Sequence, residues 1–371
     1  MVLDLQPESV DALEFDPTPL KESLSRLSDA AQNLDVFIVR MKNKDSAILA
    51  TIFTEFIPQL PTIRKLQIPL GGALVPNAFY PLCLNRSLAV ADFRIYSGTF
   101  DLDRLLVPSN PFPNLRTLHL TSMISFYLPL VQSLRSTLLN CIRLSFVEHA
   151  PCPSETFHSL IQATCCASTS LQTLELTIKA PSSHRTLSNL PTAAVLLPLL
   201  AHRKLEELTI DLGVPIQMSD GDIDTIAYMW PRCRRLRLVS NISGDALPTG
   251  WRPMCTFRGI TALLYHLRNL DELAIEFDAT TLDDTDDGIG PLDLTSPSPE
   301  GERLWAQIRR PSQLRSLDVG HSPGGDPLAV AGWIGVLCPK LVKFKWTDES
   351  EKWARARLVL NKIRDVRSRG L

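Results

Sequence analysis

A short motif of alternating apolar and polar residues recurs along this chain. Its clearest copy runs from Pro113 to Leu120 and reads PNLRTLHL. In an extended strand Leu118 and Leu120 point to one face, and Thr117 and His119 point to the other. The motif therefore predicts a short strand that is buried on one face only.

The same spacing of apolar residues, with Ile, Val, Phe, Cys or Trp in place of some leucines, recurs twelve times. The stretches between the copies carry apolar residues three and four positions apart, for example Ile48–Ile57 and Ile223–Trp230, which predicts amphipathic helices. Most intervals between copies lie in or just above the roughly 20–29 residues typical of a leucine-rich repeat. The copies begin at Val10, Leu34, Ile63, Val90, Leu115, Leu139, Leu171, Leu205, Cys233, Leu270, Leu314 and Leu341.

A single strand–helix unit of this kind cannot bury its apolar face alone, so neighbouring units must stack. We therefore predict an α/β leucine-rich-repeat solenoid, a curved horseshoe with parallel strands on the concave face and helices on the convex face. It would form one domain over residues 1–371, with about twelve irregular repeats. An acidic, Ser/Pro-rich loop is expected at 279–300 and a C-terminal cap helix at 351–369, with Trp353, Ala356, Leu360 and Ile363 on one stripe.

Composition and charge indicate an intracellular protein. The net charge is −2, and the first twenty residues carry acidic side chains but no Lys or Arg, which does not fit a secretory or mitochondrial leader. The apolar run Ala193–Ala201 contains Pro198 and is too short to cross a bilayer. The eight cysteines form no C-x-x-C pair, so neither a zinc site nor a disulfide framework is indicated. We expect a cytoplasmic or nuclear protein without membrane contact.

Two segments contain residue types that can carry chemistry. Gly320–Asp326 places His, Ser and Asp close together in sequence, but adjacent residues on one turn rarely form a catalytic triad. Asp283–Gly288 resembles the start of a calcium loop, yet Leu294 stands where the bidentate Glu belongs. We therefore expect no enzyme activity, no metal and no cofactor.

The concave face is the predicted binding surface, since the residues that flank the second apolar position of each repeat leave the core. Acidic and basic residues are mixed there, which favours a protein partner over nucleic acid, whose binding requires mostly positive charge. The predicted partner-binding residues are Lys65, Asp92, Arg94, Thr117, His119, Arg143, Glu175, Glu207, Arg235, Arg237, Glu272, Asp318, Lys343 and Lys345.

Three strand entries, Phe112–Leu115, Trp230–Cys233 and Cys338–Leu341, resemble those of the irregular fungal F-box proteins with leucine-rich repeats. The resemblance implies a substrate-recognition part of a ubiquitin-ligase subunit, in which the repeats hold the target and an F-box binds the Skp adaptor of a cullin complex. The chain has no matching F-box segment; Ile48–Phe53 lacks the Leu-Pro that opens one. Skp and cullin are thus expected partners only if an F-box lies upstream. The alternatives are a stand-alone scaffold or inhibitor of the ribonuclease-inhibitor type, and a GTPase-activating repeat protein.

Overall fold

A computed structural model describes most of the chain, and its residues cluster into two compact units. The first unit is Met1–Ala150 with Ser159–Ala180, and the second is Pro151–His158 with Pro181–Leu371. Each unit is described by itself, and a single continuous domain over 1–371 stays a prediction. The described residues are 2–5, 34–41, 62–70, 83–95, 111–134, 138–148, 152–179, 190–242, 247–248, 250–280, 312–347 and 350–368, with Thr18, Glu22 and Arg26.

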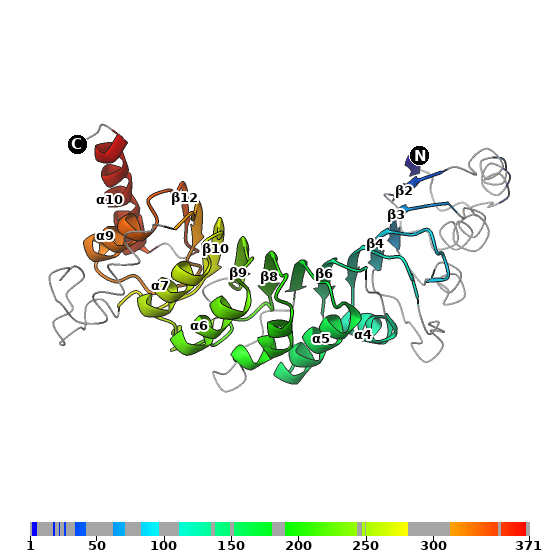
Figure 1. The fold of residues 1–371 in the computed structure, drawn as a ribbon, viewed down its shortest axis with the longest axis horizontal. Helices are drawn as coiled ribbons and strands as arrows, with labels where there is room; N and C mark the ends of the chain where they lie inside the picture. Colours follow the sequence, from blue (N-terminus) through cyan, green and yellow to red (C-terminus); the bar gives the residue numbers. More distant parts are fainter. Residues whose placement is uncertain are drawn as a thin grey trace, which may run out of the picture. The chain divides into compact units, whose positions relative to one another are not determined.

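In the first unit, consecutive strands pair in parallel, each with the next one along the chain (Figure 1). Helices α4 (Ile124–Ser133) and α5 (Ser154–Ala167, from Ser159 on in this unit) follow β5 and β6. The strands are β1 (Val2–Leu5), β2 (Val36–Met41), β3 (Lys65–Leu70), β4 (Val90–Ile95), β5 (Thr117–Ser122), β6 (Cys141–Val147) and β7 (Thr173–Lys179).

The second unit repeats the same order of strand and helix, again with consecutive strands in parallel. Its strands are β8 (Glu207–Asp211), β9 (Arg235–Leu238), β10 (Glu272–Ile275), β11 (Ser316–Asp318) and β12 (Lys343–Lys345). Its helices are η5 (a 3-10 helix, Ala193–Ala201), α6 (Asp220–Met229), α7 (Phe257–His266), α9 (Pro327–Leu337) and α10 (Glu351–Ser368). The predicted α/β class with parallel strands is confirmed in both units.

The apolar residues of the motif form the core, as predicted. Leu115, Leu118 and Leu120 are at most 1% exposed, and the equivalent residues of β6 and β7 are equally buried. The first leucine lies in a turn that precedes the strand, so the described strands from β5 to β12 begin two residues later than the motif. The Arg116 carbonyl in this turn accepts hydrogen bonds from both Asn140 N and Cys141 N, which joins one repeat to the next.

Local signals explain where the helices begin. Ser219 and Asp222 form a capping box at the start of α6. The Asp220 carboxylate in turn accepts hydrogen bonds from Thr256 N (2.7 Å) and Gly259 N (3.1 Å), at the start of α7. The acid thus satisfies amide groups that the first turn of a helix leaves without intrahelical partners, and it holds α6 beside α7.

The last helix packs on the end of the second unit, where the cap helix was predicted. Figure 1 shows α10 beside α9 and β12. Trp353 is 1% exposed, lies edge-on to Phe344 and donates a hydrogen bond from Nε1 to the Ser322 carbonyl (2.8 Å). The Arg357 guanidinium lies 4.8 Å from the ring centre of Trp346. This helix covers apolar side chains that the last strand would otherwise leave exposed.

Several details differ from the sequence-based expectations. The first described strand is Val2–Leu5, whereas the predicted segment Val10–Phe15 lies outside the described residues. Helix α9 was not predicted, although Asp326 followed by Pro327 is a typical start: Asp326 Oδ2 accepts from Ala329 N (2.8 Å). The run Ala193–Ala201 forms a 3-10 helix that contains Pro198. The predicted loop is described only at Ala279 and Thr280.

Candidate binding surface

In each unit the described helices lie on one face of the sheet, and we call the opposite face the open face. In unit one the open face shows clearly in the burial pattern, because exposed and buried residues alternate along β5, β6 and β7. Parallel register places equivalent residues side by side, about 4.8 Å apart between neighbouring strands. The open face is therefore a set of straight rows that run across the strands.

The central row of unit one carries charges of both signs. Arg143 Nε lies 3.3 Å from Glu175 Oε2, and both side chains are about half exposed (46% and 49%). An ion pair with this exposure is screened by water and contributes little to stability. In strand order from β3 to β7 the row consists of Gln67, Asp92, His119, Arg143 and Glu175.

Small polar side chains flank this charged row on both sides. On β5, β6 and β7 these residues are partly exposed and none is longer than three heavy atoms, so the charged side chains of the central row project furthest there, whereas the exposed Lys65 continues one flanking row on β3. A bound chain can therefore approach the sheet closely on either side of the row. The flanking residues are Thr117, Cys141 and Thr173 on one side and Thr121, Ser145 and Thr177 on the other.

His119 is the middle residue of the row and is only partly exposed. Burial lowers the pKa of its imidazole, Arg143 lowers it further, and Asp92 and Glu175 oppose that shift. Its Nε2 is buried and has no hydrogen-bond partner among the described residues. The lowered pKa favours the neutral form of the imidazole, which contributes an aromatic position between Asp92 and Arg143.

The predicted position of Arg94 needs a correction. A motif with Val90 first and Phe93 second predicts that Arg94 and Asp92 both lie on the binding face. The structure pairs Ala91 with Leu118 and Phe93 with Leu120, so the repeat begins at Leu88 and the flanking residues are Val90 and Asp92. Arg94 falls one row further on, in register with Thr121. The error arose because Leu88, Ala91 and Phe93 satisfy the motif spacing as well as Val90, Phe93 and Ile95 do.

In unit two, one row of the open face is joined by ion pairs across three strands. Arg235 on β9 lies between Glu207 on β8 and Glu272 on β10 in register. Its Nη1 is 3.1 Å from Glu207 Oε2, and its Nε is 3.0 Å from Glu272 Oε2. Ser316 and Lys343 continue this row on β11 and β12.

The next row contains an ion pair that skips one strand. Arg237 Nη2 lies 3.4 Å from Asp318 Oδ2, although β10 runs between their strands. The intervening residue of the row is Ala274, which is fully buried. Thr209 begins this row, and Lys345 ends it.

The two lysines of β12 differ from the other charged residues of unit two. Both are exposed, and within the described part of the chain neither has a carboxylate within ion-pairing distance. Asp318, which is in register with Lys345, is engaged by Arg237. The open face therefore ends in an uncompensated positive pair.

Glu276 occupies a position of the open face that the structure covers. It is 5% exposed, and the backbone N–H of His321 lies 3.4 Å from its Oε1. Burial raises the pKa of the Glu276 carboxyl to about 8, and the nearby carboxylates Asp318 and Asp211 add to the shift. The sequence motif ends before this residue, so its burial could not be read from the repeat pattern.

His321, Ser322 and Asp326 each form a hydrogen bond with the backbone. The His321 ring Nε2 lies 2.9 Å from the Ile242 carbonyl oxygen. Ser322 Oγ accepts from Phe277 N (2.9 Å) and donates to the Val319 carbonyl, while Asp326 caps α9. Each of these contacts is with a backbone group.

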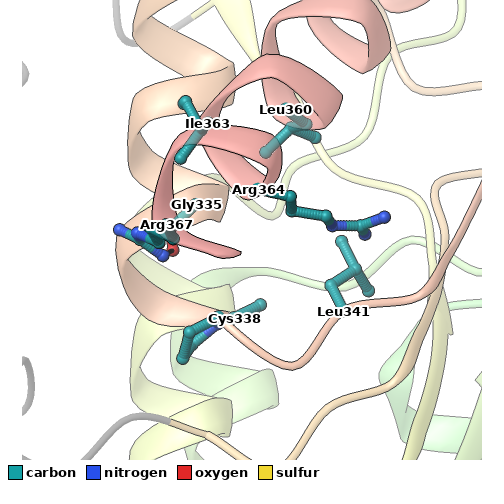
Figure 2. Close-up of a pocket in the computed structure, with 8 residues that line it drawn as sticks. Gly335, Cys338, Leu341, Leu360, Ile363, Arg364 and Arg367 are labelled. Carbon is teal, nitrogen blue, oxygen red and sulfur yellow. Dashed lines mark hydrogen bonds between the residues drawn. The ribbon is translucent and has the colours of Figure 1, made fainter. Parts of the chain in front are cut away.

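No metal site emerges in the described parts of the chain. No group of three or more His, Cys, Asp or Glu side chains is placed to hold a metal ion there. The hollow between α9 and α10 has a volume of about 10 Å³, room for about one water. Figure 2 shows Ile363 and Leu360 of α10 beside Gly335 of α9, and Arg367 Nη1 donates to the Gly335 carbonyl (2.8 Å).

The helices of the described residues also lack the length and hydrophobicity needed to span a membrane. No model of a known protein family matches the chain, and a comparison with curated proteins finds no match either. The open face is thus the surface on which a functional argument rests.

Proposed function

We propose that this chain is a non-catalytic protein-binding repeat protein, and that its ligand lies on the open face of the parallel sheet. The observation that supports this proposal is the row of Asp92, His119, Arg143 and Glu175, held in register on four neighbouring strands. Strand pairing fixes the spacing of these side chains before a partner arrives, which lowers the entropy lost on binding.

The chemistry of the row favours a protein as the ligand. Positive and negative charges alternate with a neutral imidazole, and such a pattern discriminates between partners by charge complementarity. A nucleic acid would meet Asp92 and Glu175 with its own negative phosphates. Because the flanking residues on β5, β6 and β7 are small, the backbone or short side chains of a partner can contact the sheet beside the charged row.

The strand entries at Trp230–Cys233 and Cys338–Leu341 favour one specific form of this function. In this form the chain recognises substrates for an F-box-type ubiquitin ligase. Its support is the resemblance alone. Binding of the Skp adaptor and a cullin would require an F-box segment in addition to residues 1–371. A stand-alone scaffold or inhibitor would use the same open face without the adaptor, and a GTPase activator would also have to present a side chain to a bound nucleotide.

Site-specific photo-crosslinking tests the location of the ligand. Benzoylphenylalanine is introduced at Thr117 or Thr173 on the open face, or at the exposed Gln162 on α5 as a control. In native cell extract we expect the two open-face positions to capture the same protein and Gln162 to capture none of it. Capture from Gln162 but from neither threonine would refute the proposal.

A matched charge reversal tests the same point by affinity. Arg143 lies on the open face, whereas Arg116 is exposed in the turn before β5 and forms no ion pair in the described structure. Arg143→Glu is expected to weaken capture of the crosslinked protein by about tenfold or more, and Arg116→Glu by less than about twofold. Co-capture of a Skp adaptor and a cullin by the longest chain that the locus encodes separates the ligase form from the scaffold form.

A further inference from the structure

The charged residues on the open face of unit two sort into those that neutralise one another and those that do not. Arg235 is held between Glu207 and Glu272, and Arg237 is paired with Asp318. A partner that used these arginines would first have to displace a carboxylate from each. They are therefore poor candidates for the main contacts with a ligand.

Lys343 and Lys345 remain available. They lie two residues apart on β12, so both ammonium groups extend from the same face of the strand, with their Cα atoms about 6.6 Å apart. Both are exposed, and no ion pair occupies either of them within the described residues. Two like charges this close raise the local positive potential on the last strand of the sheet.

We call Lys343 and Lys345 the terminal basic patch. Arg357 of α10 is also exposed, but it stacks on Trp346. The Trp346 ring lies beside Phe344, whose side chain leaves β12 on the face opposite to the two lysines, so Arg357 is not part of the patch.

We propose that the terminal basic patch binds an acidic peptide segment of the partner protein, in an extended conformation with carboxylates at alternate positions. This inference rests on the proposed function and specifies the chemistry of the ligand at one end of the open face. Alternate side chains of an extended peptide recur at about the same 6.6–6.8 Å spacing as the two lysines. Each carboxylate can then meet one ammonium group without a change in the sheet.

The limited extent of the patch favours a peptide over a nucleic acid or an anionic membrane. Asp318 on β11 is in register with Lys345. Glu272 on β10 lies in the same row as Lys343, two strands away from it. A long phosphate backbone or a flat anionic surface would come close to both carboxylates. A short acidic segment along β12 avoids them.

Fluorescence anisotropy on the full chain tests the proposal. The probe is a fluorescein-labelled peptide of alternating Glu and Ser, and the reference peptides are alternating Lys and Ser of the same length. We expect binding of the acidic peptide only, and a loss of about tenfold or more in affinity in the double variant Lys343→Glu, Lys345→Glu. The control variant, Arg203→Glu with Lys204→Glu, makes the same charge change at two exposed residues before β8 and should alter affinity by less than about twofold.

Three outcomes would overturn the proposal. Equal loss in the two double variants would mean that only net charge matters. Tighter binding of a single-stranded RNA of equal length, with the same dependence on the two lysines, would assign the patch to nucleic acid. Unchanged peptide binding together with self-association of Lys343→Ser, Lys345→Ser in sedimentation would show that the lysines only protect the edge strand. The crosslinking from Thr117 is independent of β12, so the proposed function can stand if this inference fails.

Discussion

The Arg237 guanidinium reaches across Ala274 to the Asp318 carboxylate, with Nη2 3.4 Å from Oδ2. The three residues lie in one row on β9, β10 and β11, and only a small side chain at the middle position leaves room for the pair. Ala274 is completely buried although it belongs to the open face. A charged pair thus takes the place of solvent above β10.

Enlarging Ala274 tests this relationship. We expect Ala274→Leu to lower the free energy of unfolding by about 1–3 kcal/mol, because the added carbons collide with the overlying arginine. In an Arg237→Ala background, Ala274→Leu should lower the free energy of unfolding by less, because no arginine side chain then lies over residue 274. Urea unfolding of the four members of this cycle measures the coupling, and strictly additive losses would contradict the arrangement.

The inside–outside assignment of the motif can be tested at neighbouring residues of β5. Leu118 is fully buried, while Thr117 is partly exposed on the open face. Leu118→Asp should destabilise the protein by several kcal/mol, because it buries an unpaired charge, and Thr117→Asp should cost under about 1 kcal/mol. Equal losses in chemical denaturation would reverse the assignment of the two faces.

Glu276 predicts a specific dependence of stability on pH. Its carboxyl holds a proton up to about pH 8 in the folded protein, whereas in the unfolded chain it titrates near its ordinary value of 4.5. Between these values the unfolded state has released the proton and the folded state has kept it. Stability should therefore fall with rising pH across this window by up to about 1.4 kcal/mol for each pH unit, with no further change above pH 8.

The substitution Glu276→Gln isolates this effect, because the amide stays neutral at every pH. We expect the variant to gain stability relative to the wild type as the pH rises from 5 to 8, measured by urea unfolding at several pH values. Asp211, Asp318 and His321 face the same region and are unchanged in both proteins, so the difference between the two curves reports Glu276. Parallel curves would show that its carboxyl is already ionised at pH 5.

Gly320 is required beside Glu276 for two reasons. Its φ of +52° favours glycine, and a Cβ there would lie 2.8 Å from Glu276 Cγ. Gly320→Ala should cost about 2–4 kcal/mol, the sum of backbone strain and displacement of Glu276.

Gly250 provides the matched control, since its φ of +77° is also left-handed but an added Cβ would meet nothing within 4 Å. Gly250→Ala should therefore cost only the backbone strain, about 1 kcal/mol. Thermal unfolding of the two variants compares these costs. If Gly320→Ala lowers stability no more than Gly250→Ala does, the Glu276 side chain moves away from the added Cβ at no energetic cost.

The sequence by itself determined the class of fold and the faces of the strands. The period-two alternation in Thr117-Leu118-His119-Leu120 sends leucines inward and polar residues outward in any parallel sheet, because the strand geometry allows nothing else. The intervals between motifs leave room for one helix each, which predicts parallel strands. These are local properties of the backbone, so a single sequence reveals them.

The tertiary structure decided the register of the strands and which charged side chains form ion pairs or become buried. In β4 two frames fit the motif, and only pairing with β5 selects Ala91 and Phe93 as the inward residues, which moves Arg94 away from the predicted row. Arg237 pairs with Asp318, which lies 81 positions further along the chain. The pair forms because β9 and β11 lie on either side of β10 and because the small Ala274 lies between the two side chains. Glu276 is buried because the segment at His321 folds over it. Such contacts depend on which strands become neighbours and on the room between them, which no local pattern records.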